Sequence, residues 1–518
     1  MKLSYKRTLL CGLAFFGITA FWQAYDATIP VILTNKFGMS QTWSGAIMAL
    51  DNVLAVFLLP LFGAISDKHN GKRGKRTPFI LVGTILAAVL LMGLSAVDNA
   101  QLKNISYVSK IDDPAALSVI YDSQSESKLR TPDGKDFVLS DVFETKEAFM
   151  AVRSEIINED GETEINPFYT DYVAPARQAY VASKTAENST QLILFIVMLF
   201  GLLLSMALFR SPAVALMPDI TVKPLRSKAN AIINLMGTAG GILVLVLGMV
   251  FATSAVKNQM MSYTAYYGVI AGVMIVSLIV FLITVKEKKW AEEMRTDSIK
   301  YGIEEDKEEE CGGKSLDRSQ KTSLIFILLS VALWYFGYNA VTSKYAVYAT
   351  NILNKDYNTT MLLAQAAAII AYIPAGLIAS KIGRKKTIIG GVVMLSGSFL
   401  AASFMDASSP TALMNVMFAL AGIGWATINV NSFPMAVEMC AGSDIGKYTG
   451  YYYTASMTAQ IITPIFSGFL MDKIADTVLF PYAAVFAGLA LVTMLFVKHG
   501  DSKVPVKASV LENLDVDG

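Results

Sequence analysis

Charged residues are scarce in this chain. Only 16% of its 518 residues are Asp, Glu, Lys or Arg, whereas 54% are hydrophobic. A soluble domain carries charge on roughly a quarter of its residues, so we expect much of the protein surface to face a lipid bilayer. The net charge of +1 excludes a dominant role in binding nucleic acid, because that role needs a concentrated basic face.

Cysteine and histidine are also rare. Cys11, Cys311 and Cys440 show no metal-ligand or disulfide spacing, so neither redox chemistry nor a cofactor is expected. The two histidines, His69 and His499, fall in segments that we assign to the cytoplasm, which excludes them as central proton carriers. The apolar segments hold no nucleophile–base pair, so an enzyme is the weakest interpretation.

Long apolar segments, by contrast, are abundant. A membrane-spanning helix needs about 20 mostly apolar residues. The first such segment follows Lys2, Lys6 and Arg7 but continues past any suitable signal cleavage site, so we interpret it as an uncleaved span. Twelve segments qualify: 9–34, 42–66, 77–97, 190–217, 228–254, 262–285, 322–345, 358–380, 387–405, 410–437, 446–471 and 479–497.

The orientation of these spans follows from alternate basic loops. Lys and Arg gather at 68–76, 223–228 and 381–386, and such clusters mark cytoplasmic loops. The connector 286–321, which contains an acidic run at 304–310, falls on the same side. The sequence therefore predicts a multi-pass protein of the cell membrane with both termini in the cytoplasm.

A polar stretch at 98–189 falls on the opposite, external side. It holds 17 Asp and Glu against 9 Lys and Arg, and its residues 137–157 are apolar enough to fold. We interpret it as a partly ordered external insert. The predicted domains are an N-terminal six-helix half (1–285) containing this insert, a cytoplasmic connector (286–321), a C-terminal six-helix half (322–497) and a cytoplasmic tail (498–518).

The two halves resemble each other in sequence. A shift of 313 residues places the polar and aromatic segment 21–27 over 334–340. Farther on, a shift of 222 places Pro212 over Pro434, and the difference of 91 residues nearly equals the insert. One insertion explains both shifts, as expected for internal repeats of a transporter.

The loops after the second and eighth spans carry a matching motif. Residues 63–68 (Gly-Ala-Ile-Ser-Asp-Lys), followed by Gly-Lys-Arg at 71–73, resemble the Gly-x-x-x-Asp-Arg/Lys-x-Gly-Arg-Arg signature of the major facilitator superfamily. Residues 376–385 resemble its weaker copy, although any loop that follows the positive-inside rule holds such charges. The resemblance implies an all-α membrane protein of twelve transmembrane helices, built as two pseudo-symmetric six-helix bundles.

The same resemblance implies a cytoplasmic gate, in which glycines allow close helix contact and Asp67 pairs with a cation or caps a helix. We assign to this gate Gly63, Asp67, Lys68, Arg73, Arg76, Arg210, Asp219, Gly376, Lys381 and Arg384.

A narrower resemblance rests on residues 45–80 and 210–237. Ser-Asp-Lys at 66–68 with Lys-Arg-Gly-Lys-Arg-Thr-Pro-Phe-Ile at 72–80 is similar to an element of sucrose transporters and of their relatives, the glycoside–pentoside–hexuronide:cation symporters. Arg-Ser-Pro at 210–212 is similar to the end of the fourth span in that group. This resemblance implies a saccharide substrate and coupling to a cation.

Polar residues within the spans mark the transport pathway, because they are costly in a membrane. Trp22, Gln23, Tyr25 and Asp26 lie near the middle of the first span. Aromatic faces and paired acceptors suit the C–H face and the hydroxyls of a sugar. Asp26 is expected to bind sugar or to hold the coupling proton, although an Asp that only pairs with another helix is the alternative.

The second span contains Asp51 and Asn52. Related symporters place paired carboxylates about one turn away, at positions that hold Ala55 and Leu59 here, so a Na⁺ site of that kind is in doubt. Proton coupling would then use Asp26 or Asp51, and a purely structural role for Asp51 stays open.

The second half repeats the polar pattern. Asn339 matches Asp26, and the polar residues of both halves together suit a neutral, hydroxyl-rich solute; for any one Asn, a hydrogen bond that only bridges two helices is the alternative. Arg210 and Lys344 lie near span ends, where snorkelling to the membrane surface is the simplest interpretation. The candidate substrate-binding residues are Trp22, Gln23, Tyr25, Asp26, Asn52, Tyr335, Tyr338, Asn339, Gln365, Trp425 and Asn429.

Taken together, the sequence predicts a monomeric secondary transporter for a small polar solute, most simply a sugar or glycoside, driven by H⁺ or Na⁺. An exporter of drug-like or lipid substrates would need a more uniformly apolar cavity. A membrane sensor whose insert binds the ligand is a second alternative. The identity of the solute, the coupling ion, the direction of transport and the role of the insert stay open.

Overall fold

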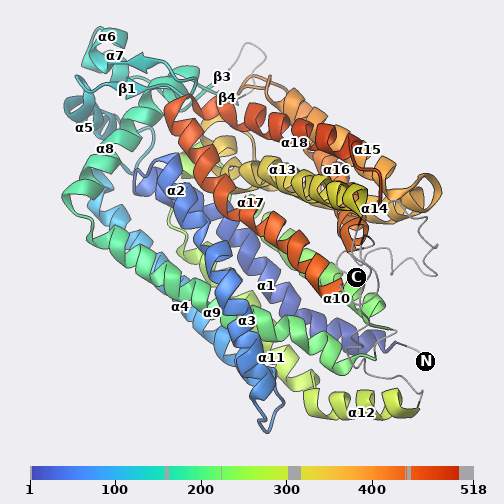
Figure 1. The fold of residues 1–518 in the computed structure, drawn as a ribbon. Helices are drawn as coiled ribbons and strands as arrows, with labels where there is room; N and C mark the ends of the chain where they lie inside the picture. Colours follow the sequence, from blue (N-terminus) through green and yellow to red (C-terminus); the bar gives the residue numbers. More distant parts are fainter. Residues whose placement is uncertain are drawn as a thin grey trace.

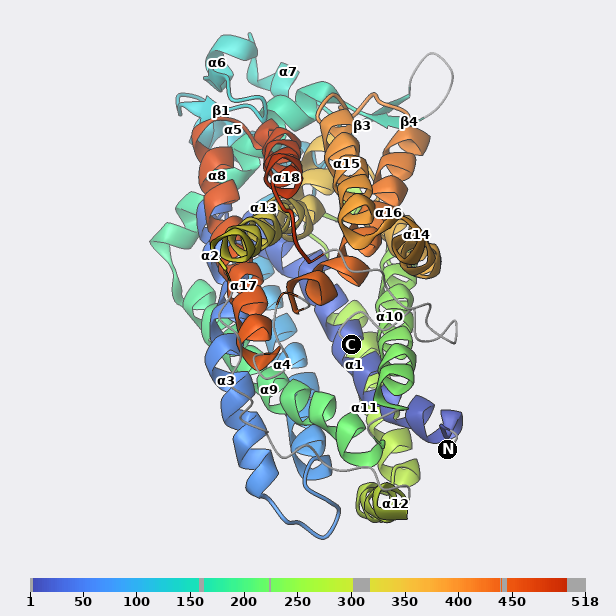
Figure 2. The ribbon, with the colours of Figure 1, turned by 45° about the vertical axis from the view of Figure 1, so that its right-hand side comes forward.

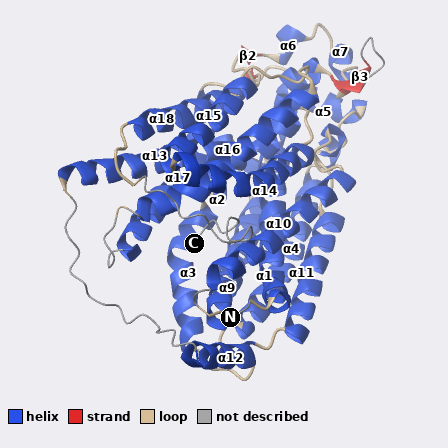
Figure 3. Cartoon of the chain, turned by 90° about the vertical axis from the view of Figure 1, so that its right-hand side faces the viewer, coloured by secondary structure: helices blue, strands red, loops and turns tan. Residues whose placement is uncertain are grey.

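The computed structural model is almost entirely helical (Figures 1 and 3). It describes residues 3–157, 163–222, 225–300, 317–437, 439 and 445–500. Several sequence assignments lie outside these described residues: the acidic run 304–310, the tail from 501 onwards, Cys311 and Cys440.

The N-terminal half consists of six long helical stretches. Its helices are α1 (Tyr5–Val31) with the π-helical turn η1 (Ile32–Lys36), α2 (Gln41–Met48) with α3 (Leu50–Lys68), α4 (Thr77–Asn104), α9 (Thr190–Ile220), α10 (Arg226–Val250) and α11 (Thr264–Thr284). Helix α12 (Glu287–Lys300) follows and lies across the end of this half (Figures 1 and 2).

The C-terminal half repeats this plan. Its helices are α13 (Arg318–Tyr348) with η6 (Ala349–Leu353), α14 (Tyr357–Ile382), α15 (Arg384–Ala402), α16 (Thr411–Val437), α17 (Ile445–Lys473) and α18 (Leu479–Leu495). Eleven helices of the described chain are long and apolar enough to cross a membrane. The twelfth stretch, α17, has 29 residues and is rich in Tyr, Thr and Ser. The all-α fold of two six-helix bundles is thus confirmed.

Matching π-helical turns end the first helix of each half. The turn η1 carries Asn35 and η6 carries Asn351, and each side-chain amide donates to the other's oxygen, over 3.2 and 2.7 Å. A reciprocal bond between the two matching turns is expected where a pseudo-two-fold axis passes between two repeats.

Each half has its own apolar core, and small residues allow its helices to approach closely. In the N-terminal half, α10 packs on α1 at Gly240, where a Cβ atom would lie 2.2 Å from the carbonyl oxygen of Phe16. Close backbone contact of this kind is typical of helix packing in membranes.

The segment between α4 and α9 forms a separate small subdomain at the end of the bundle opposite α12 (Figures 1 and 2). Its core contains the buried side chains Leu117, Ile120, Phe149 and Val173. Its elements are η2 (Ser106–Val108), α5 (Pro114–Gln124), β1 (Leu129–Arg130), β2 (Asp136–Phe137), α6 (Leu139–Val142), α7 (Lys146–Met150), β3 (Glu155–Ile157), β4 (Thr163–Ile165), η3 (Tyr169–Val173) and α8 (Ala174–Glu187).

Strands β1 and β2 pair antiparallel, as do β3 and β4. A buried arginine, Arg177 of α8, fixes the fold of the subdomain by donating to the carbonyl oxygens of Val108 and Ile111. We call this subdomain the insert, the end of the bundle that carries it the insert end, and the opposite end the α12 end.

Candidate functional site

A polar cavity of about 240 Å³ lies between the two halves. Helices α1, α2, α3 and α9 line it from the N-terminal half, and α13 and α17 line it from the C-terminal half. The lining residues are Trp22, Tyr25, Asp26, Met48, Asp51, Asn52, Arg210, Asn339, Thr342, Ser343, Gln460 and Pro464.

Three charged side chains face this cavity. Asp26 and Asp51 are close enough to repel each other, and Arg210 interacts electrostatically with Asp51. The amide of Asn52 donates to the Asp51 carboxylate over 2.8 Å. Two carboxylates face one guanidinium, so the ionised cluster carries one excess negative charge, and a charge inside a membrane protein needs a partner.

Three hydrogen-bond donors in the same lining lack a partner. The indole N–H of Trp22, the hydroxyl of Tyr25 and the side-chain amide nitrogen of Asn339 are buried without a hydrogen bond among the described residues. Buried polar groups are almost always paired. Together with the two carboxylates as acceptors, these donors can bind a solute that carries several hydroxyl groups.

A hydrogen-bonded glutamine pair joins the halves beside the cavity. Gln365 of α14 donates to Gln23 of α1 over 2.6 Å, and Gln23 donates to the Tyr357 hydroxyl over 3.1 Å. Both glutamines were assigned to the substrate site from sequence, but here they bond each other and do not line the cavity.

An aromatic cluster occupies the C-terminal half. The rings of Tyr338 and Trp425 stack with centroids 3.6 Å apart and planes 2° apart, and Tyr335 meets Trp425 edge-on at 5.1 Å. These rings and Asn429 of α16 lie outside the cavity lining. The structure therefore brings six of the assigned residues together in the cavity lining: Trp22, Tyr25, Asp26, Asp51, Asn52 and Asn339.

Sequence reasoning missed several lining residues. Thr342 and Ser343 lie one turn after Asn339 on α13, so a search for polar residues at helical spacing would have found them. Arg210, which we grouped with the cytoplasmic residues, lines the cavity instead because α9 packs against α3.

Four of the residues assigned to the gate, Gly63, Asp67, Arg76 and Asp219, meet at the α12 end of the N-terminal half. Arg76, which is 5% exposed, donates to Asp219 of α9 over 2.7 Å and also to Asp67 and Ser66 of α3. Its guanidinium lies 3.5 Å from the Gly63 carbonyl oxygen. One arginine thus ties together the ends of three helices, and charge-assisted bonds of this kind are the strong ones.

Glu287 of α12 is a further member that the sequence analysis missed. Its carboxylate accepts from the backbone N–H groups of Arg76 and Thr77, over 2.9 and 2.8 Å, and from the Thr77 hydroxyl over 2.6 Å. It therefore caps the first turn of α4, whose unpaired N–H groups favour a negative charge.

The remaining gate assignments are dispersed. Lys68 and Arg73 are exposed and form no ion pair with a described residue. In the C-terminal half, Gly376 lies in α14, Lys381 is exposed at the end of that helix, and Arg384 is buried where α15 begins.

At the insert end the halves are joined directly. Asp472 of α17 accepts from the backbone N–H groups of Gln41 and Thr42, at the start of α2, over 2.8 Å each. Lys344 of α13 donates to the Gln41 carbonyl oxygen and is fully buried, so the expectation that it snorkels to the membrane surface is wrong. A Cβ atom at Gly45 would clash with the Pro464 carbonyl oxygen, which shows how closely α2 and α17 approach.

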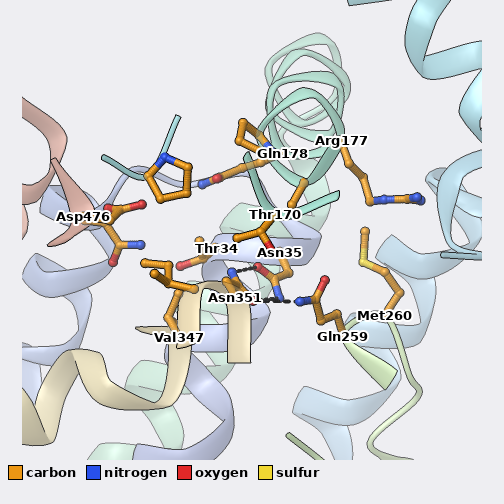
Figure 4. Close-up of a pocket in the computed structure, with 15 residues that line it drawn as sticks. Thr34, Asn35, Thr170, Arg177, Gln178, Gln259, Met260, Val347, Asn351 and Asp476 are labelled. Carbon is orange, nitrogen blue, oxygen red and sulfur yellow. Dashed lines mark hydrogen bonds between the residues drawn. The ribbon is translucent and has the colours of Figure 1, made fainter. Parts of the chain in front are cut away.

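A small cavity of about 50 Å³ lies beside this junction, and Figure 4 shows the residues that line it. The Asn35–Asn351 pair lies in it, and Gln259 donates to Asn351 over 3.2 Å. Gln178 comes from the insert and Asp476 from the C-terminal half, so the insert and both halves share this space.

Comparison with known proteins identifies the family of the chain. The profile described as "Major Facilitator Superfamily" matches residues 179–364 and 327–513, and the profile described as "MFS/sugar transport protein" matches residues 10–107. Two relatives are "MFS-type transporter ppzB" of Metarhizium majus, 26% identical over 138 residues, and of Metarhizium rileyi, 24% identical over 154 residues. These matches cover 26% and 30% of this chain, and only 30% and 31% of the relatives' own lengths.

Solved structures share the fold at low sequence identity. A bacterial homologue of the iron transporter ferroportin, in an inward-facing state, has a TM-score of 0.58 at 12% identity and covers 95% of this chain and 99% of its own. The inward-open xylose transporter XylE from E. coli has a TM-score of 0.52 at 14% identity and covers 98% of both chains. The profile match over residues 179–513 shows that the chain belongs to the Major Facilitator Superfamily, and its eleven candidate spans among the described residues make it a multi-pass membrane protein.

Proposed function

We propose that this protein is a secondary active transporter of a small, hydroxyl-rich solute, most simply a sugar or glycoside, coupled to a proton or another monovalent cation. The observation that carries the proposal is the cavity between the halves, where two carboxylates face three donors without partners. A sugar presents hydroxyl groups that donate and accept at once, and such groups would satisfy both kinds of side chain.

The charge in the cavity supports coupling. Arg210 compensates one of the two carboxylates, which leaves one negative charge for a bound cation to neutralise. Asp51 is held by Asn52 and by Arg210, whereas Asp26 makes no hydrogen bond with a described side chain. We therefore assign the coupling ion to Asp26 first and to Asp51 second.

Alternating access would be the mechanism, with the two six-helix halves rocking about this cavity. In the proposed topology the insert lies outside, and the connector, both termini and the α12 end lie in the cytoplasm. The bonds between α2 and α17 would then close the external side, and the charged network of Arg76 would lie at the cytoplasmic gate.

The test is uptake of radiolabelled sugars and glycosides by proteoliposomes, with a pH gradient and a Na⁺ gradient imposed separately. For the solute that is transported, Asp26→Asn keeps the size of the side chain but removes its charge. If Asp26 carries the coupling ion, gradient-driven accumulation by this variant should fall by about tenfold or more, while solute exchange continues. A tenfold fall corresponds to a loss of about 1.4 kcal/mol in coupling free energy.

Asp406→Asn is the matched control, because Asp406 is an exposed carboxylate that bonds only within its own loop. Loss of exchange together with accumulation would assign Asp26 to solute binding instead. Wild-type accumulation by Asp26→Asn would contradict both roles and make Asp51 the residue to replace next. Transport of apolar compounds alone, with no sugar or glycoside carried, would favour an exporter of drug-like substrates.

A further inference from the structure

A basic hollow lies at the α12 end of the protein, outside the cavity between the halves. It has a volume of about 520 Å³ and is bounded by the loop before α4, the end of α11 and the start of α12. Its lining residues are Lys72, Arg73, Thr77, Ile279, Leu282, Ile283, Val285, Lys286, Glu287, Lys288 and Lys289.

Five of these side chains are cations, and most of them have no partner. Lys72, Arg73, Lys286 and Lys288 are exposed and form no ion pair within the part of the chain that the structure describes. Lys289 contacts Glu293 only at 3.8 Å, and the two side chains are 67% and 39% exposed. Such a concentration of one sign of charge attracts an anion.

The only acidic residue in the lining does not neutralise this charge. Glu287 is 4% exposed, and its two oxygens already accept from the first turn of α4 and from Thr77. Its carboxylate is therefore directed to α4, and the five cations around the hollow stay available for an external ligand.

The other wall of the hollow is apolar and exposed. Ile279 and Ile283 belong to α11, a helix long and apolar enough to cross a membrane, and their exposed fractions are 49% and 72%. Helix α12 lies across the end of the bundle (Figures 1 and 2). Its residues Lys288 and Lys289 line the hollow together with the end of α11. Cations thus lie directly beyond an exposed apolar surface.

We propose that this hollow binds the headgroup of an anionic phospholipid, with its acyl chains along Ile279 and Ile283. A phosphate held by lysines at the membrane surface, next to apolar side chains, matches the amphiphilic shape of such a lipid, and each cation near an anionic membrane surface strengthens binding. Free phosphate would use the cations but not the exposed isoleucines, so the lining favours the lipid.

Binding there would act on the gate network through Glu287. The same α12 segment that supplies Lys288 and Lys289 caps the first turn of α4, and Arg76 in that turn holds Asp67 and Asp219. An anionic lipid would hold α12 and the loop before α4 together, and so stabilise the arrangement of these three helix ends. The proposal needs only the membrane location of the protein and does not depend on its solute.

The experiment is native mass spectrometry of the full-length protein in detergent, titrated with phosphatidylglycerol or with phosphatidylcholine of the same chains. The wild type should bind phosphatidylglycerol more tightly than phosphatidylcholine. Lys72→Gln/Lys288→Gln should weaken phosphatidylglycerol binding by about tenfold or more, because each lysine contributes to the attraction, and should leave phosphatidylcholine binding unchanged.

The control is Lys103→Gln/Lys110→Gln, which removes two exposed lysines at the insert end. This variant should bind phosphatidylglycerol like the wild type. Equal binding of both lipids by the wild type, equal weakening by both double variants, or displacement of the lipid by millimolar inorganic phosphate would each overturn the proposal. As a second measurement, a benzophenone side chain at position 283 should crosslink phosphatidylglycerol, and failure to do so would contradict the assigned position of the chains.

Discussion

The insert end and the α12 end of this protein are held together in different ways. At the insert end the strong bonds cross from one half to the other, because Asp472 of α17 caps α2 and Lys344 of α13 donates to Gln41. At the α12 end, Arg76 and Glu287 make their bonds within the N-terminal half. The halves can therefore separate at the α12 end without breaking these networks, whereas separation at the insert end breaks bonds.

The largest effect on stability is expected from breaking a buried ion pair that lies inside one half. This change should leave the junction between the halves intact. Lys36 and Asp98 contact each other at 2.7 Å with both side chains fully buried, and Lys36 also lies 4.5 Å from the centre of the Tyr263 ring. Lys36→Met leaves the Asp98 carboxylate buried without its partner. We expect a loss of about 3–5 kcal/mol in unfolding free energy.

Thermal unfolding in detergent measures this effect. The double variant Lys36→Met/Asp98→Leu should recover most of the loss, since replacing both charges removes the unpaired one. The control is Lys184→Met, whose exposed pair with Glu187 should contribute less than about 1 kcal/mol. A double variant as unstable as Lys36→Met would contradict this account of the pair.

A smaller effect is expected at the junction itself. Asp472→Ala removes the acceptor for two backbone N–H groups of α2. A hydrogen bond to a charged group contributes about 1.5–3 kcal/mol, and two bonds to the same carboxylate are not additive, so closure of the insert end should weaken by about 2–4 kcal/mol. In a cysteine-free background, a cysteine at Thr34, which is 1% exposed, should then react faster with a water-soluble maleimide, by more than about tenfold.

Asp406→Ala serves as the control for that measurement, because its carboxylate bonds only to Ser408 and Ser409 in its own loop. An unchanged reaction rate in Asp472→Ala would show that this bond does not hold the insert end closed.

The insert adds a weaker contact across the same junction. Its turn between β1 and β2 rests on the loop that follows α17, where the Asp476 N–H donates to the Pro132 carbonyl oxygen over 2.8 Å. Gly134 in this turn has φ +88° and no room for a side chain, since a Cβ atom would lie 2.2 Å from the Ile474 carbonyl oxygen. Gly134→Val should loosen the insert end by about 1–3 kcal/mol, measured by the same maleimide reaction.

Gly268→Val is the control for this substitution, because nothing lies within 4 Å of the Cβ position on that residue. Equal rates in the two valine variants would mean that the turn does not contribute to closure.

The smallest effect is a pH dependence of the stability of the turn between β1 and β2. Hydrogen bonds from Lys135 and Thr131 lower the pKa of Asp133 below its ordinary value. Because the pKa of Asp133 is lowered in the folded state, its ionised carboxylate stabilises the turn at pH values above the unfolded pKa of about 3.9. This stabilisation is lost as the pH falls through the folded pKa. Backbone amides of the turn should therefore exchange hydrogen faster at low pH, after correction for intrinsic rates, and Asp133→Asn should abolish that dependence. Unchanged exchange in the wild type would contradict it.

The helices could be predicted from sequence because an apolar run long enough to cross a membrane satisfies its backbone hydrogen bonds there by forming a helix. The predicted span 262–285 and helix α11 (Thr264–Thr284) differ by no more than two residues at either end. The span predicted at 387–405 begins earlier, at Arg384, because the basic residues that signalled a loop form the first turn of α15. The strands of the insert, each of two or three residues, leave no periodic signal and could not be predicted.

The site could be predicted only in part. Asp26, Asp51 and Asn339 stood out because polar groups are costly within spans. Arg210 was placed with the cytoplasmic residues, since only the packing of α9 on α3 brings it to the cavity. Glu287 lies 210 residues from Thr77, and no local pattern in the charged connector marks it as the cap of α4.

The central claim, that the halves close at one end when they open at the other, is tested most directly by two pairs of spin labels. One pair, at Asn188 and Pro410, reports on the insert end, and the other, at Asn70 and Lys386, reports on the α12 end; all four sites are exposed. In Asp472→Ala compared with the wild type, electron–electron resonance should show the Asn188–Pro410 distance increase and the Asn70–Lys386 distance decrease. A change in the first distance with the second unchanged, or two changes of the same sign, would contradict the account.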